Sequence, residues 1–294
     1  ILSLLGVQKE SLPDIVSSYT VLPLEEGVSK YLSLPKDVKL VMGLYDGGAV
    51  AIAGGIFGKA RKAIVNLGTT GMIRIVSEKP IIDSNSILKL QTLYLCDNKW
   101  FTGGSVNNAG LVIEWLKKIL KIDFNKLERH NHIISDNLLF YPYLTGERGL
   151  DFGCEARGVI YGLESKYSAQ DIFIAALEGV AFTLKLMTEP LIEKEINFEK
   201  VSVSGGGIKL KQWVYILANV LNKEVNIPQF TEPALVGSMM LGGVALGWFS
   251  SLNEVTESIT GNEAAVIPES AVVDIFDKKY IMFVSTLKRI YALK

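Results

Sequence analysis

The turn Asn66-Leu67-Gly68-Thr69-Thr70-Gly71 is the first segment whose residue types favour chemistry. It lies between the apolar runs 63–67 and 72–76, which are predicted to form the two strands of a hairpin. Glycine lets a backbone approach a phosphate closely, and this turn offers amide N–H groups and two hydroxyls to an anion. It therefore predicts a phosphate-binding hairpin, with an ordinary hairpin turn as the alternative.

A second glycine-rich turn, Ser204-Gly205-Gly206-Gly207, follows the predicted strand 201–203 and precedes a helix expected to begin near Ile208. At such a junction the free N–H groups and the dipole of the helix favour a phosphate or a nucleotide. The spacing matches neither GxGxxG nor GxxxxGK[ST], so it does not indicate a Rossmann or a Walker site. The turn predicts either a nucleotide site or a tight packing turn.

A carboxylate, Asp46, lies between a predicted strand at 39–44 and a predicted small-residue helix at 49–56. Proteins with α/β sheets bind ligands beyond the carboxyl ends of strands, so Asp46 is a candidate catalytic residue, with a helix cap as the alternative. Two phosphate-type turns and one such carboxylate together favour phosphoryl transfer, where positioning and charge neutralisation supply most of the catalysis. Asp46 would accept the proton of a substrate hydroxyl as the P–O bond forms.

The overall composition excludes several other functions. The 294 residues include 30 basic and 31 acidic side chains, so no broad nucleic-acid-binding surface is expected. Hydrophobic residues make up 49%, which argues against disorder. Cys96 and Cys154 lie too far apart for a metal knuckle, and the two histidines, His130 and His132, lie in the polar run 128–136. We therefore predict no metal-ligating residues, free buried thiols in a reducing cytoplasm, and acid–base chemistry on carboxylates, lysines or tyrosines.

One uncharged stretch, 233–252, is long enough to be considered as a membrane span, since about 20 apolar residues cross a bilayer. It contains several glycines and serines, and Pro233 suits the first position of a helix. We predict a fully buried, tightly packed helix here and no membrane partner. The apolar start of the chain, 1–7, lacks the basic leader of a secretory signal.

Hydrophobic periodicity and turn residues predict the elements that must position these residues. Hairpins come first in the chain, at 63–76 and 88–102, and strands alternate with helices later. That order is typical of a mixed α/β sheet with helices on its faces. Further strands are predicted at 138–143, 158–163 and 224–227, and helices at 112–120, 168–192, 210–221, 233–248 and 272–290.

The order of these segments resembles the FGGY carbohydrate kinases, and within them a gluconokinase-like branch. The resemblance implies a ribonuclease H-like or actin-like ATPase fold. Residues 63–294 would form the nucleotide-binding domain II, and residues 1–62 the end of the sugar-binding domain I. The matching segments are GLYDGGAVAIAGG (43–55), NLGTTG (66–71), TGGSVNNAGLVIEWL (102–116), PYLTGER (142–148), EARGVIYGL (155–163), ALEGVAF (176–182), SGGGIKLKQWVYILANVL (204–221) and ALVGSMMLGGVALG (234–247).

The resemblance also implies roles for single residues. Asp46 corresponds to the base that takes a proton from the sugar hydroxyl, and Gly237 to a helix that connects the two domains. Glu147 and Arg148 correspond to a signature whose implied role is structural, a paired charge that supports the loop. ATP and Mg²⁺ are implied as cofactors, and a sugar or sugar acid as the substrate. The implied nucleotide-binding residues are Gly68, Thr69 and Thr70, then Gly110 and Glu114, then Gly205, Gly206 and Gly207.

The chain departs from the family in its N-terminal part, because no DxGT-type element precedes Asp46. Such kinases carry there a first phosphate hairpin, an acidic residue for Mg²⁺ and most sugar contacts. We therefore expect most of domain I to be missing, which would leave the strand at 39–44 without sheet partners and with an exposed edge.

Three functions follow as hypotheses. The first is a cytoplasmic kinase for gluconate or a related acid, and the second a nucleotide-binding module of the same fold without activity. The third is an actin- or Hsp70-like ATPase, against which the segments 142–148 and 176–182 argue. The resemblance also allows a homodimer, as members of the family often form.

Overall fold

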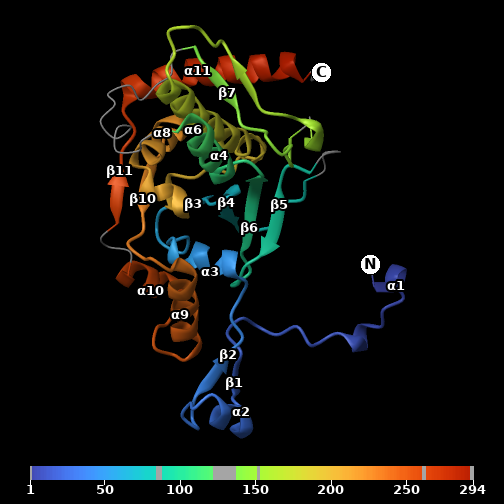
Figure 1. The fold of residues 1–294 in the computed structure, drawn as a ribbon. Coiled ribbons are helices and arrows are strands. Elements are labelled where there is room, and N and C mark those ends of the chain that lie inside the picture. The colour runs from blue at the N-terminus through green and yellow to red at the C-terminus, as the bar shows by residue number, and fades with distance from the viewer. Residues whose placement is uncertain (1, 84–87, 122–136, 151–152, 260–262, 292–294) are drawn as a thin grey trace.

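The computed structural model describes residues 2–83, 88–121, 137–150, 153–259 and 263–291, and a mixed seven-stranded sheet forms its centre (Figure 1). The strand order is β11-β10-β9-β3-β4-β6-β5. The fold therefore confirms the expected mixed α/β class. The strands are β3 (Lys62–Leu67), β4 (Gly71–Ser77), β5 (Gln91–Tyr94), β6 (Trp100–Val106), β9 (Lys200–Ser204), β10 (Glu224–Ile227) and β11 (Ala264–Val266).

The two expected hairpins are confirmed as β3–β4 and β5–β6. β9 runs parallel to β3, with Ser204 opposite Asn66. Parallel neighbours end at the same edge of a sheet, so the turn 68–70 after β3 and the turn 205–207 after β9 emerge side by side. We call them the hairpin turn and the glycine turn.

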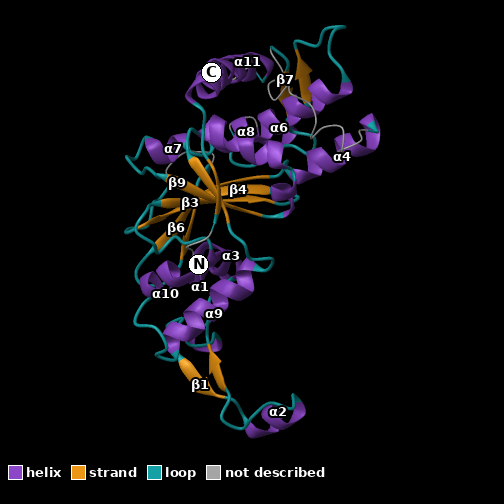
Figure 2. Cartoon of the chain, turned by 90° about the vertical axis from the view of Figure 1, so that its left-hand side faces the viewer, coloured by secondary structure: helices purple, strands orange, loops and turns teal. Residues whose placement is uncertain are grey.

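Helices cover both faces of the central sheet (Figure 2). Alternation along β3 builds both cores, since Val65 packs on the side of α6 and α8 whereas Ile64 packs on the side of α3 and α9. The helices of the first side are α4 (Gly110–Leu120), α6 (Ala169–Leu186), α8 (Lys211–Leu221) and α11 (Ser270–Ile290); those of the second are α3 (Asp46–Ala53), α9 (Pro233–Ala245) and α10 (Leu252–Ile259).

The single helix expected over 168–192 is instead two helices, α6 and the short α7 (Glu189–Ile192). The start is as expected, because the Ser168 hydroxyl accepts a hydrogen bond from the Asp171 amide and the Asp171 carboxylate accepts one from the Ser168 amide. In a continuous helix the ring of Pro190 would clash with the carbonyl of Leu186, so α6 ends there.

The expectation that 233–252 is fully buried is wrong. Gly237 and Leu241 of α9 are buried, whereas Leu235 and Met239 are 69% and 54% exposed. A helix that lies on one layer buries only the side facing that layer, and an uncharged composition does not reveal which residues face outward. No helix in the described part of the chain is long and apolar enough to cross a membrane.

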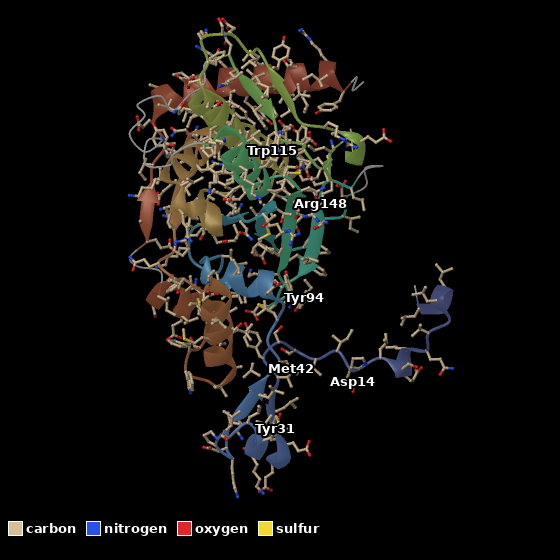
Figure 3. The ribbon with its side chains drawn as sticks, in the orientation of Figure 1. Asp14, Tyr31, Met42, Tyr94, Trp115 and Arg148 are labelled. Atoms are coloured by element: carbon tan, nitrogen blue, oxygen red, sulfur yellow. The ribbon has the colours of Figure 1, made fainter. Side chains whose placement is uncertain are left out.

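The residues before α3 form an arm that extends away from the central sheet, with Tyr31 near its far end (Figure 3). The expectation that the strand at 39–44 lacks sheet partners is wrong, because β2 pairs with the antiparallel β1 and Leu40 lies opposite Leu22. The exposed edge is as expected, because this sheet has two strands and the other edge of β2 is unpaired within it. β1 is three residues long and ends in proline, so it shows no alternation that a pattern could detect. The elements of the arm are α1 (Leu2–Leu5), a 3₁₀ turn (Lys9–Ser11), β1 (Val21–Pro23), α2 (Glu26–Tyr31) and β2 (Lys39–Val41).

The remaining elements lie outside the central sheet. A small antiparallel sheet consists of β7 (Leu139–Tyr141) and β8 (Val159–Tyr161), which confirms the strands expected at 138–143 and 158–163. One 3₁₀ turn, Gly206–Lys209, continues the glycine turn into α8.

Candidate functional site

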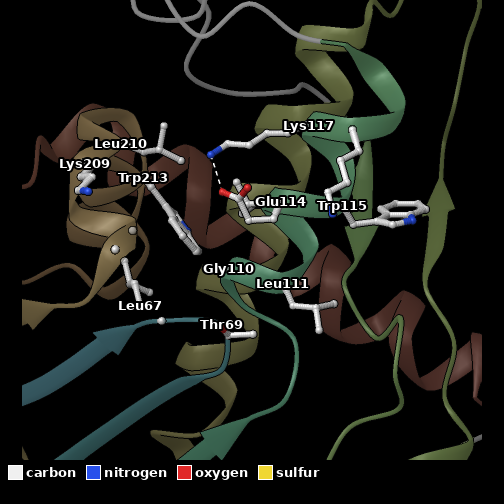
Figure 4. A pocket seen from close by; sticks show the side chains of 15 residues that line it. Leu67, Thr69, Gly110, Leu111, Glu114, Trp115, Lys117, Lys209, Leu210 and Trp213 are labelled. Atoms are coloured by element: carbon white, nitrogen blue, oxygen red, sulfur yellow. Dashed lines mark hydrogen bonds and ion pairs between the residues drawn. The ribbon is translucent and has the colours of Figure 1, made fainter.

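A hollow of about 900 Å³ opens where the hairpin turn, the start of α4 and the glycine turn meet (Figure 4). Three segments far apart in sequence therefore converge on one hollow. Of the predicted nucleotide-binding residues, Thr70 and Gly205 belong to these turns but do not line this hollow. Those that line it are Gly68, Thr69, Gly110, Glu114, Gly206 and Gly207.

The hairpin turn holds the start of α4 by backbone hydrogen bonds. The amide of Gly110 donates to the carbonyl of Gly68 at 2.8 Å, and the amide of Leu111 donates to the carbonyl of Thr69 at 3.1 Å. A Cβ atom on Gly110 would lie 2.5 Å from the Gly68 oxygen. The first amides of α4 are thus occupied, and the exposed side chains of Thr69 and Thr70 remain for a ligand.

The three glycines of the glycine turn meet different surroundings. Gly205 has φ +92°, and a Cβ there would lie 2.3 Å from the Asn66 side chain. A Cβ on Gly207 would lie 2.7 Å from the Trp213 ring, whereas one on Gly206 would have no described atom within 4 Å. Packing therefore requires two of the glycines, and the third presents bare backbone to the hollow.

The wall of the hollow combines an aromatic ring with basic side chains. Trp213 is 1% exposed, and its indole N–H has no acceptor within the described residues. Lys117 forms an ion pair with Glu114 at 2.6 Å at the rim, and Lys118 and Lys209 also line the hollow. An apolar slot edged by cations suits a ligand with a flat base and an anionic tail. Sequence reasoning missed Trp213 and the lysines, although Trp213 lies in the first turn of α8, the helix that follows the glycine turn.

A smaller hollow of about 690 Å³ continues toward α3. It shares Gly206 and Lys209 with the larger one, and Val50 of α3 lines its far side. The Ser204 hydroxyl also lines it and is buried without a hydrogen-bond partner among the described residues. The glycine turn therefore faces both hollows.

Asp46 is the first residue of α3, and its side chain is exposed. Its carboxylate accepts a hydrogen bond of 2.7 Å from the amide of Gly47, the next residue of the helix. The cap position belongs to Tyr45, so Asp46 is not the helix cap that was the alternative. Asp46 and Val50 lie one turn apart on the same side of α3, and Val50 lines the smaller hollow whereas Asp46 does not. α3 is fixed by α9, because a Cβ on Gly237 would lie only 1.8 Å from the carbonyl oxygen of Ala49.

The pairing expected between Glu147 and Arg148 is not what the structure shows. Glu147 is 1% exposed and accepts hydrogen bonds from the amides of Asn107 and Arg148 and from the side chain of Asn108. Burial raises the pKa of this carboxyl group, and the hydrogen bonds oppose the shift. Glu147 thus connects its loop to the residues that lead into α4. This role is structural, and its hydrogen-bond donors are amide groups and not the Arg148 guanidinium.

The histidines and cysteines that the sequence singled out are not part of this site as far as the structure describes them. His130 and His132 lie outside the described residues, as does the side chain of Cys154, and Cys96 is a buried free thiol. Across the described ranges, no group of three or more His, Cys, Asp or Glu side chains is placed to hold a metal ion.

Comparison with known proteins identifies the family. Residues 63–246 match the model of the C-terminal domain of the FGGY family of carbohydrate kinases. The chain is 30% identical over 217 residues to a gluconokinase of Bacillus subtilis, covering 68% of this chain and 42% of that protein. It is 26% identical to the xylulose kinase of the same organism, covering 98% of this chain and 58% of that one.

The fold leads to the same proteins. A crystal structure of gluconate kinase from Lactobacillus acidophilus matches 99% of this chain and 60% of that one, with a TM-score of 0.88 and 25% identity. The chain therefore spans about half the length of the relatives that it matches. By the family model over more than half of its length, the chain belongs to the FGGY family of carbohydrate kinases.

Proposed function

We propose that this protein takes part in ATP-dependent phosphorylation of a hydroxyl group on a sugar or sugar acid. The observation that carries the proposal is the convergence of the hairpin turn, the start of α4 and the glycine turn on one hollow. Its volume of about 900 Å³ is in the range of cofactor sites, and its lining is mostly apolar with a few basic groups. The kinase names of the relatives support the same reaction class.

In this proposal the two hollows bind different parts of the nucleotide. The adenosine part lies in the larger one, between Trp213 and the start of α4, and the phosphates extend past the bare backbone of Gly206 toward the smaller one. Thr69 of the hairpin turn and Lys209 offer a hydroxyl and a cation to the phosphates. This arrangement directs the terminal phosphate toward α3.

Asp46 acts as the general base in this proposal. The sugar hydroxyl oxygen forms a bond to the terminal phosphorus, the bond to the leaving diphosphate breaks, and the hydroxyl proton passes to the Asp46 carboxylate. Mg²⁺ in kinases is held mostly by nucleotide phosphates and water, with one or two carboxylates. The described residues contain no metal cage, so Mg²⁺ fits here as part of the nucleotide complex, where it neutralises phosphate charge.

A nucleotide-binding module without turnover is the second candidate, since the chain spans 42% of its gluconokinase relative. Calorimetry with ATP and Mg²⁺, together with a coupled ADP assay over gluconate, xylulose and glycerol, separates the two. Binding with turnover supports the kinase, and binding without turnover supports the module. No nucleotide binding at all would contradict both.

Two further expectations belong to this proposal. The division of the chain at 62/63 into the end of a sugar-binding domain and a nucleotide-binding domain is one of them. A cytoplasmic location is the other, and it rests on cysteine usage, with Cys96 buried and free. Limited proteolysis near residue 62 and cell fractionation test them.

A further inference from the structure

A buried arginine lies on the side of the sheet that carries α3. Arg74 of β4 is 8% exposed and alternates with Ile73 and Ile75, which pack on the opposite side. Its guanidinium lies 5.7 Å from the centre of the Phe101 ring. Phe101 belongs to the core that includes Ala51 of α3, so Arg74 lies on the same side of the sheet as the helix that Asp46 begins.

A glycine in β6 leaves room for the Arg74 side chain to lie across that strand toward β5. Gly103 of β6 lies opposite both Arg74 of β4 and Gln91 of β5. A Cβ on Gly103 would clash with the Ile73 carbonyl of β4 and would lie 2.8 Å from Cγ of Arg74, so glycine is required both for the approach of the two strands and for the position of this side chain. Across the gap, Nη2 of Arg74 donates to the Gln91 side chain at 2.6 Å and to the Ser105 hydroxyl at 3.3 Å.

The guanidinium keeps unused donors. Of the five N–H groups that a guanidinium carries, these two bonds occupy those of Nη2. Nε is shielded from solvent and has no acceptor in the described part of the chain. The hydroxyl of Tyr45, the residue before Asp46, is also buried without a described partner. Buried donors without acceptors are costly, so this arrangement needs a reason.

The charge of Arg74 also lacks a compensating carboxylate among the described residues. The groups that act on it electrostatically are Tyr45 and Arg148, and within the described ranges no carboxylate is among them. Arg148 is exposed and lies near the β5 edge of the sheet (Figure 3). Tyr45 lies between this cation and the proposed base. Burial raises the pKa of the Tyr45 hydroxyl most strongly, the charge of Arg74 lowers that pKa, and the charge of Asp46 raises it. A buried cation without an anion would be replaced by an apolar residue if stability alone mattered.

We propose that Arg74 is a specificity-determining residue that binds the carboxylate of a sugar acid while Asp46 faces the hydroxyl at the other end of the same molecule. The inference rests on the proposed function. A carboxylate supplies the acceptors that Nε and the Tyr45 hydroxyl lack among the described residues, and a negative charge between Arg74 and Arg148. The N–H groups that Gln91 and Ser105 do not occupy bind it by charge-assisted hydrogen bonds. A neutral sugar supplies no such charge.

The test compares D-gluconate with D-glucitol, which carries a hydroxymethyl group in place of the carboxylate. Binding to the full chain is measured by calorimetry in the presence of a non-hydrolysable ATP analogue and Mg²⁺. We expect gluconate to bind at least about tenfold more tightly than glucitol, as for a charge-assisted contact. Arg74→Gln should remove this preference and leave glucitol binding and nucleotide binding unchanged.

The controls separate this inference from the proposed function. Arg61→Gln changes an exposed arginine just before β3, at the end of that strand opposite the hairpin turn, and should keep the preference for the acid. Arg74→Lys keeps the charge without the planar fork and should bind gluconate with intermediate affinity. Turnover with gluconate tests the proposed function, whereas the ratio of acid to polyol affinity tests Arg74.

Three results would overturn the inference. The first is that the wild type binds gluconate and glucitol equally, or binds neither. The second is that Arg74→Gln keeps the preference for gluconate. The third is that Arg74→Gln loses nucleotide affinity, which would assign Arg74 to the phosphates. A normal melting temperature of Arg74→Gln shows that any loss of preference is not a loss of fold. A preference for the acid without turnover would support Arg74 and contradict the kinase.

Discussion

The amide of Gly110 donates a 2.8 Å hydrogen bond to the carbonyl of Gly68, which joins the start of α4 directly to the hairpin turn. A Cβ atom on Gly110 would lie 2.5 Å from that same oxygen. One wall of the larger hollow is therefore positioned by a backbone contact that tolerates no side chain.

Gly110→Ala should lower both the stability and the nucleotide affinity of the protein. The added methyl group must push α4 away from Gly68, which costs about 1–3 kcal/mol in overpacking. A displaced wall should weaken ATP binding by about tenfold or more. Urea unfolding and calorimetry measure the two effects, and unchanged values for both would contradict the assigned contact.

Gly206→Ala is the matched comparison in the same hollow. Its Cβ would have no described atom within 4 Å, so the free energy of unfolding should change by less than about 1 kcal/mol. The methyl group would nevertheless occupy the space that the proposed phosphates pass. ATP affinity should fall while the melting temperature stays, and wild-type affinity in this variant would exclude Gly206 from the site.

Asp46→Asn should remove turnover and preserve binding. The amide retains an oxygen for the Gly47 amide but no longer takes a proton, so kcat should fall by about 10²–10⁴. The side chain is exposed, and stability should remain within about 0.5 kcal/mol of the wild type. The coupled ADP assay and calorimetry decide, and near-normal turnover would disprove the role of base.

Lys279→Met should destabilise the protein by about 3–5 kcal/mol, because it leaves the Glu178 carboxylate buried without its cation. Lys279 of α11 and Glu178 of α6 are 4% and 1% exposed, and their side chains lie 2.5 Å apart. The double variant with Glu178→Leu removes both charges and should recover most of the loss. Urea unfolding of the four proteins measures the coupling, and additive losses would show that the pair is not coupled.

Glu147 should contribute a pH dependence of stability with a definite sign. Burial raises its pKa, so around the usual pKa of a glutamate the folded protein binds a proton that the unfolded chain has released. This contribution to stability is complete below the unfolded pKa and is lost as the pH rises through the folded pKa. In urea unfolding between pH 4 and 7, the advantage of the wild type over Glu147→Gln should shrink as the pH rises. A difference that stays constant or grows would contradict the raised pKa.

Local patterns predicted the parts of the site that are themselves local. Glycine and threonine between two apolar runs indicated the hairpin turn, and the register of β3 with β9 then brought the glycine turn beside it. Ser168 and Asp171 marked the start of α6 correctly. These features depend on residues within a few positions of one another, so the sequence displays them directly.

Features that depend on distant partners could not be read in this way. The outward face of α9 depends on where α3 lies, and the acceptor role of Glu147 depends on Asn107, 40 positions earlier in the chain. The partners of Arg74 lie on neighbouring strands, and the gap at Gly103 becomes meaningful only once the sheet register is known. Such contacts carry no signature in the order of residues.

The contact of Gly237 with Ala49 leaves no layer of side chains between α9 and α3 at that point. Because the two backbones are in direct contact there, we expect α3 and α9 to move together as one rigid unit. Asp46 is the first residue of α3 in this unit, and Pro233 and Ala234 of α9 form part of the wall of the smaller hollow. A movement of α3 that carries the Asp46 carboxylate toward a substrate would therefore also move Pro233 and Ala234 and change the shape of the smaller hollow.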